Sequence, residues 1–87
     1  DEAQPLAQQL LERENLSRMM PDDFATVREY LQRRSHMSTS AQAKLSLNIA
    51  QQLQEKLKME PRAWDVTANV FLEALYLAYQ QHFRSSR

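Results

Sequence analysis

The stretch Ala68–Tyr79, ANVFLEALYLAY, decides the fold because it is apolar on nearly every side of a helix. Only one charged residue, Glu73, and one amide, Asn69, interrupt it. As a helix rising about 1.5 Å per residue, the stretch would span roughly 18 Å, well short of the bilayer hydrocarbon core of about 30 Å. A helix that is apolar all round is normally buried in protein. The stretch therefore predicts the central helix of a helical bundle rather than a membrane span.

The composition of the chain favours helices and excludes several kinds of site. The 87 residues include no Cys, so disulfides, zinc–thiolate sites and thiol nucleophiles are excluded. They also include no Gly, which argues against a phosphate-binding P-loop or a dinucleotide-binding fingerprint. Ala, Leu, Gln, Glu, Arg and Lys are abundant, and these are good helix formers. The 11 basic and 11 acidic residues cancel, so the whole domain has no electrostatic attraction to nucleic acid or anionic lipid.

Hydrophobic periodicity and punctuation predict four helices. Pro5 and Pro61 suit the first turns of the first and the last helix, where an N–H group has no helical partner. Met59 and Trp64 occupy the two positions of a hydrophobic staple at the start of the last helix. The expected helices lie near residues 4–14, 22–34, 39–58 and 61–83.

Polar residues at the predicted helix starts are expected to act as caps. Asp22 or Asp23 can cap the second helix and favour the positive end of its dipole. Ser38 or Thr39 is expected to cap the third helix, with Thr39 and Gln42 in the spacing of a capping box.

The second and third helices are both amphipathic. Glu29 precedes Arg33 by four residues, which is the favourable order for a surface ion pair. Apolar residues at helical spacing predict the buried faces, with Phe24, Val27 and Leu31 in the second helix and Leu45, Ile49, Leu53 and Leu57 in the third.

These features predict an all-α, four-helix bundle-like domain whose C-terminal helix is the most buried element. Short connections predict that successive helices are antiparallel. We expect residues 1–87 to be a single domain and a fragment of a longer chain.

No residue pattern predicts a catalytic, cofactor-binding or metal-binding site, so we do not expect an enzyme. His36 and His82 are isolated from other residues at metal-ligand spacing. The aromatic residues of the last helix are expected to be core residues rather than the lining of a ligand pocket; they are Trp64, Tyr76, Tyr79 and Phe83.

The apolar surface of the last helix predicts a protein partner. Three neighbouring helices cannot cover all sides of this helix, so a second copy or another protein is expected to cover the rest. The predicted function is protein–protein interaction or self-association, with a homodimer as the simplest assembly. The expected partner-binding residues are Val70, Leu72, Leu77 and Tyr79, with Tyr30 nearby.

Nucleic-acid binding is the alternative prediction. Arg28, Arg33 and Arg34 are close in the sequence of the second helix and are expected to form a small positive patch. The second and third helices, joined by SHMSTS (35–40), have the order of a helix-turn-helix. The start of the third helix, however, offers few side chains that reach base edges.

One region of the chain resembles a known family. The segments DDFATVREYLQRR (22–34) and MSTSAQAKLSLNIAQQLQEKL (37–57) are similar to the soluble helical region that accompanies the membrane domain of some bacterial RDD-family proteins. The Arg and the two Asp that name that family belong to membrane segments absent from this sequence, so they are not assigned to Asp22 or Asp23. The resemblance implies a cytoplasmic module, tethered to a membrane through a longer parent chain, and implies no catalytic residue.

Overall fold

The computed structural model of this chain describes residues 2–60 and 66–85, and within them all regular secondary structure is helical, without strands. This confirms the predicted all-α fold. Two short 3₁₀ turns, η1 (Leu16–Arg18) and η2 (Arg34–His36), follow the first and second helices. The α-helices are α1 (Ala3–Arg13), α2 (Pro21–Arg33), α3 (Thr39–Lys56) and α4 (Ala68–Ser85).

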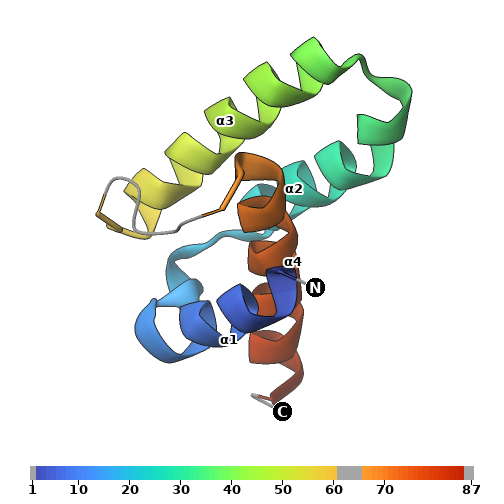
Figure 1. The fold of residues 1–87 in the computed structure, drawn as a ribbon. Helices are drawn as coiled ribbons and strands as arrows, with labels where there is room; N and C mark the ends of the chain where they lie inside the picture. The colour runs from blue at the N-terminus through green and yellow to red at the C-terminus, as the bar shows by residue number, and fades with distance from the viewer. Residues whose placement is uncertain (1, 61–65, 86–87) are drawn as a thin grey trace.

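Helix α4 is the central element, as predicted. It packs against α1 on one side and against the α2–α3 hairpin on the other (Figure 1). Helix α1 contributes Ala3, Ala7 and Leu10, which lie on one face at helical spacing and are all buried. The fully buried residues of α4 are Phe71, Leu72, Ala74, Leu75 and Ala78.

The boundaries of α1, α2 and α3 lie within two residues of the predicted ones, but α4 begins later than predicted. Val66 and Thr67 are not helical. The Thr67 hydroxyl accepts a hydrogen bond from the N–H of Val70 at 3.3 Å, so Thr67 caps the helix. The prediction of helix at 66–67 was therefore wrong because this cap was missed. The proposed staple between Met59 and Trp64 lies outside the described residues, since 61–65 are not described.

The structure shows which of the predicted alternatives caps the start of α2 and which caps the start of α3. The Asp23 carboxylate accepts the N–H of Met20 at 2.7 Å at the start of α2. The Ser38 hydroxyl accepts the N–H of Ala41 at 3.1 Å, so Ser38 caps α3. The capping box of Thr39 with Gln42 does not form, because Ser38 and not Thr39 is the N-cap; the Gln42 amide instead donates to carbonyl oxygens of the hairpin.

Helix α3 ends in a left-handed turn made without glycine. Lys58 has φ 59°, a conformation that glycine adopts at lower cost. The N–H of Met59 bonds to the carbonyl of Gln54 at 2.9 Å, and that of Lys58 to the carbonyl of Glu55 at 3.0 Å. These are the two bonds of a Schellman motif, and they stop the helix two residues before the predicted end.

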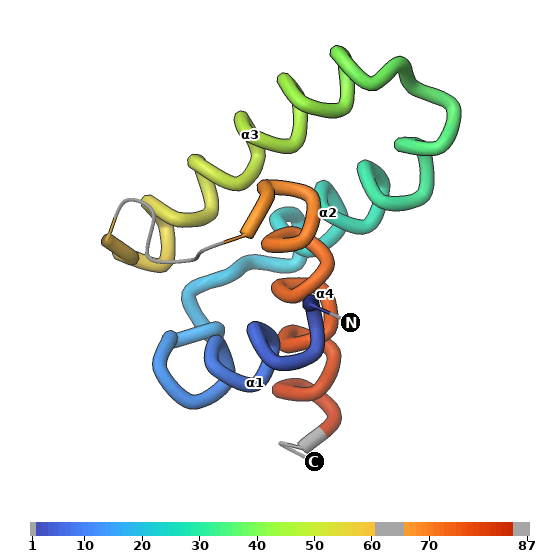
Figure 2. Tube along the Cα trace, in the orientation of Figure 1, coloured from blue at the N-terminus to red at the C-terminus, as the bar shows by residue number. Residues whose placement is uncertain are grey.

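The buried face of α3 differs from the predicted stripe in its first turns. Ile49, Leu53 and Leu57 are buried as predicted, but Leu45 is 41% exposed. Ser46 is buried instead, and its hydroxyl donates to a backbone carbonyl in the same helix. The joined ends of α2 and α3 project past the first turn of α4 (Figure 2). The prediction of a buried Leu45 was wrong because it rested on periodicity alone, which does not show which turns of α3 are enclosed by the rest of the chain.

Candidate functional site

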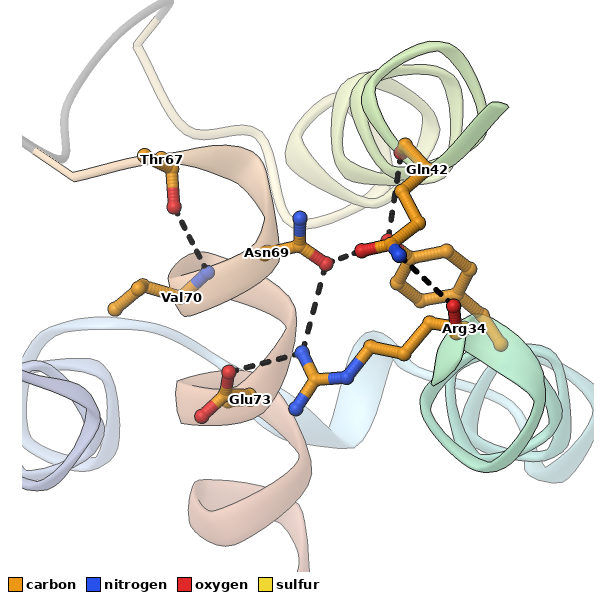
Figure 3. A network of polar contacts seen from close by, with 7 residues as sticks. Arg34, Gln42, Thr67, Asn69, Val70 and Glu73 are labelled. Atoms are coloured by element: carbon orange, nitrogen blue, oxygen red, sulfur yellow. Dashed lines mark hydrogen bonds and ion pairs between the residues drawn. The ribbon is translucent and has the colours of Figure 1, made fainter. Parts of the chain in front are cut away.

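The two polar residues of the apolar stretch hold α4 against α2. The Arg34 guanidinium donates to the Glu73 carboxylate at 2.9 Å and lies 3.5 Å from the Asn69 side-chain oxygen (Figure 3). The Tyr30 hydroxyl donates to the same oxygen of Asn69 and lies 3.4 Å from the carbonyl oxygen of Gln42 in α3. All these side chains are partnered inside the domain. We therefore interpret this network as a structural one that joins three helices.

The three arginines of the nucleic-acid alternative do not share a face. Arg34 is directed at α4 in the network just described. The guanidinium of Arg33 lies 4.0 Å from the carboxylate of Glu29, which confirms the predicted surface pair. Arg28 lies over the ring of Phe24 at 5.9 Å from its centroid. Because the three charges point in different directions around α2, they do not form one positive patch.

The predicted partner-binding residues separate into two groups. Leu72 is 0% exposed and Tyr30 is 3% exposed, so the domain itself encloses them and neither offers a surface to a partner. Val70 and Leu77 are half-buried and pack against the core. Tyr79 is also half-buried and contacts Phe24 of α2. The surface of α4 that remains is therefore smaller than the sequence suggested.

Another partly apolar surface lies between α2 and α3, where an open groove of about 650 Å³ is lined by residues of both helices. The closed end of the groove contains His36 and Met37. Each helix contributes four residues with the spacing i, i+3, i+4, i+7, which is one continuous helix face. These residues are Thr26, Glu29, Tyr30 and Arg33 from α2, and Leu45, Asn48, Ile49 and Gln52 from α3.

The groove has an apolar floor and a polar rim without excess charge. Leu45, Ile49 and Met37 supply aliphatic surface. On the α3 side, the Gln52 amide donates to the Asn48 side-chain oxygen at 2.6 Å. On the α2 side, the Glu29–Arg33 pair carries one charge of each sign. Such a surface suits an apolar ligand with a polar border.

The groove is preformed because the hairpin is tied at both ends. At the open end, the Lys56 ammonium lies 2.7 Å from the Asp23 carboxylate. At the closed end, the Gln42 amide donates to the carbonyl oxygens of Arg34 at 2.9 Å and Met37 at 3.2 Å. Between these ties the helices stand apart. A preformed groove loses less conformational freedom when a ligand binds than one that must first open.

Some of the groove residues could be recognised in the sequence as members of an apolar pattern. Leu45 and Ile49 were recognised as one apolar stripe, but they were assigned to the core. Tyr30 was singled out near a partner surface, and it forms the base of the groove rather than an exposed contact. The separation of α2 from α3 depends on tertiary packing, and no local pattern indicates it.

The described residues form no cluster of potential metal ligands. Within residues 2–60 and 66–85, no three His, Asp or Glu side chains gather as metal ligands would. His36 lies at the groove end, and His82 contacts the edge of Phe83 at 5.1 Å between centroids. No helix in the described part of the chain combines the length and the apolar character needed to cross a membrane.

No known protein family, curated protein or solved structure matches this chain. The resemblance of residues 22–57 to the RDD family therefore stays a prediction, and function is argued from the geometry alone.

Proposed function

We propose that this domain is a non-catalytic helical interaction module that binds the apolar face of another helix in the groove between α2 and α3. The observation that carries the proposal is the matched spacing of the two groove walls, each a complete helix face over an apolar floor. Docking of an amphipathic helix into an apolar groove is a recurring mode of protein recognition. Leu45, 41% exposed, is the expected centre of the contact.

A second copy of the chain is the partner that the groove favours. Two-fold pairing brings the same surface of each copy together. The rim carries Glu29 beside Arg33, so a two-fold axis across the groove can place the acid of one copy near the base of the other. The rim of the groove is therefore complementary to itself in charge. A cytoplasmic location with a membrane tether in a longer chain is also proposed, on the family resemblance alone.

Two leucines of α3 provide a matched test. Leu45 lines the groove, whereas Leu47 is 47% exposed on the same helix and is not among the groove residues. We expect the wild-type domain to become a dimer with rising concentration in light scattering, and Leu45→Asp to stay monomeric. Leu47→Asp should still form the dimer. Apolar contacts persist in high salt, so dimerisation should survive it.

The circular dichroism spectra of the two variants should match the wild type, because both residues are solvent-accessible. A wild-type domain that remains monomeric at millimolar concentration would contradict self-association. Equal loss of dimer in both variants would show that the groove is not the contact surface.

A further inference from the structure

A stack of four aromatic rings joins the start of α2 to the second half of α4. The Phe24 ring lies 4.9 Å from Tyr76 and 4.1 Å from Tyr79, with interplanar angles of 2° and 20°. Phe83 continues the stack 4.4 Å from Tyr79 and is 45% exposed. The expectation that these rings are core residues was therefore wrong at Phe83. The last turns of α4 extend beyond what the other helices cover.

The outer end of the stack borders a hollow of about 380 Å³, lined by Phe24, Tyr79, Gln80, Phe83 and Arg84, which we call the aromatic hollow. Its polar surroundings are cationic. Arg84 is one of its lining residues, and Arg28 lies 5.9 Å from the centroid of Phe24. Within residues 2–60 and 66–84, neither arginine has an acidic partner within salt-bridge distance.

The aromatic hollow and the groove lie on opposite sides of α2. At about 100° per residue, Phe24 and Arg28 share one side of the helix, while Thr26 and Arg33 lie roughly half a turn away. The first pair borders the hollow, and the second pair lines the groove. A ligand in the hollow therefore contacts a surface that dimerisation through the groove leaves accessible.

We propose that the aromatic hollow binds an acidic segment of a partner protein, with one aromatic side chain inserted beside Phe83 and flanking carboxylates paired with Arg28 and Arg84. Aromatic rings gain from stacking or edge contacts with the exposed ring. Arginine binds carboxylates in a two-pronged geometry, and neither Arg28 nor Arg84 forms a salt bridge with an acidic side chain of the described residues. Arg84 lines the hollow, Arg28 lies over Phe24, and none of the described lining residues carries a carboxylate, so the hollow discriminates against basic segments.

The same rings and arginines also suit stacked bases, but a protein segment fits better. Single-stranded nucleic acid is bound along a positive track that follows several phosphates. Among the described residues, the cations at the hollow are Arg84, which lines it, and Arg28, which lies over Phe24, in a chain of zero formal net charge. A compact hollow beside two positive charges has room for one aromatic side chain of a partner protein and can pair with the carboxylates that flank it.

The experiment uses a fluorescein-labelled peptide with a central Trp flanked by glutamates, titrated with the whole chain. We expect a rise in fluorescence anisotropy and amide NMR shifts at Phe24, Arg28 and residues 79–84. Arg84→Glu should weaken binding about tenfold, because it replaces an ion pair by repulsion. Arg28→Glu provides a second variant on another helix.

The matched control is Lys44→Glu, which changes the net charge equally at the other end of the α2–α3 hairpin, where the side chain is exposed. It should keep wild-type affinity for the peptide. Leu45→Asp should also bind the peptide normally, so failure of the groove proposal and failure of this one are distinguishable.

Four outcomes would overturn the proposal. The first is that the peptide does not bind the wild-type chain at millimolar concentration, and the second is that Arg84→Glu and Lys44→Glu weaken binding equally. The third is that a peptide with lysines in place of the glutamates binds equally well. The fourth is that a single-stranded oligothymidine binds the same residues more tightly than the peptide does. The last result would assign the hollow to nucleic acid.

Discussion

Asn69 and Glu73 show how single polar residues are accommodated in an otherwise apolar helix. Both face the end of α2 and the start of η2, where Tyr30 and Arg34 supply the donors that their oxygens need. Polar groups removed from water are nearly always hydrogen-bonded in this way. The two residues therefore mark where α2 docks on α4, and they orient the hairpin more specifically than apolar contact alone would.

The Tyr30 hydroxyl provides a test of this network. Tyr30→Phe keeps the ring but removes the donor to Asn69, so we expect a loss of about 1 kcal/mol in the free energy of unfolding, measured by urea titration. Tyr76→Phe is the matched control, since the Tyr76 hydroxyl makes no hydrogen bond to the described residues. Equal effects of the two changes would show that the network adds no stability.

At the scale of elements, the α2–α3 hairpin depends on how its helices start and stop. Ser38 begins α3, and Lys58 ends it with the two bonds of a Schellman motif. Where these helices start and stop follows from residues close in sequence. The distance between α2 and α3, in contrast, depends on long-range contacts. These are the Asp23–Lys56 ion pair, the hydrogen bond from Gln42 to Arg34 and the packing of α4 against both helices.

Two neighbouring hydroxyl residues test the start of α3. Ser38→Ala removes the acceptor for the N–H of Ala41, so it should lower the free energy of unfolding by about 1 kcal/mol. Thr39→Ala changes the first helical residue, where Ala is a good helix former, and should be neutral or slightly stabilising. Urea unfolding of both variants measures the difference. A larger effect at Thr39 would contradict the assignment of the cap.

For the whole molecule, α4 forms the centre that three other helices cover. Phe71, Leu72 and Leu75 have no exposed surface, because α1 lies on one side of α4 and the hairpin on the other. This arrangement explains why Leu72 does not belong to a partner surface. It also leaves two sides of α2 accessible. The groove lies on one side and the aromatic hollow on the other.

The same substitution, leucine to alanine, tests this arrangement at the buried Leu72 and at the exposed Leu47. Leu72→Ala should reduce the free energy of unfolding by about 2–5 kcal/mol, because it leaves a cavity at a fully buried site. Such a loss is a large share of the roughly 5–15 kcal/mol typical of a domain. Leu47→Ala, at an exposed site, should change it by less than about 0.5 kcal/mol. Similar urea midpoints for both variants would exclude a central position for α4.

The predicted surfaces were only partly correct, for a common physical reason. Leu45 and Leu53 have the same pattern in the sequence, yet Leu53 is buried and Leu45 is exposed. Likewise, Arg33 and Arg34 are adjacent, but only Arg34 lies where Glu73 can reach it. Whether a side chain is covered depends on residues far away in the chain, which local periodicity does not encode.

The sequence by itself determined the all-α class, the boundaries of three helices and the burial of the last one. These features follow from local hydrogen bonding, helix propensity and an apolar stretch with no polar face to expose. Only the tertiary structure decided that Ser46 replaces Leu45 in the core, that Tyr30 is enclosed, and that a groove and an aromatic hollow lie on opposite sides of α2. The reason is that these features depend on the relative placement of whole helices, which long-range contacts such as Arg34–Glu73 and Asp23–Lys56 establish.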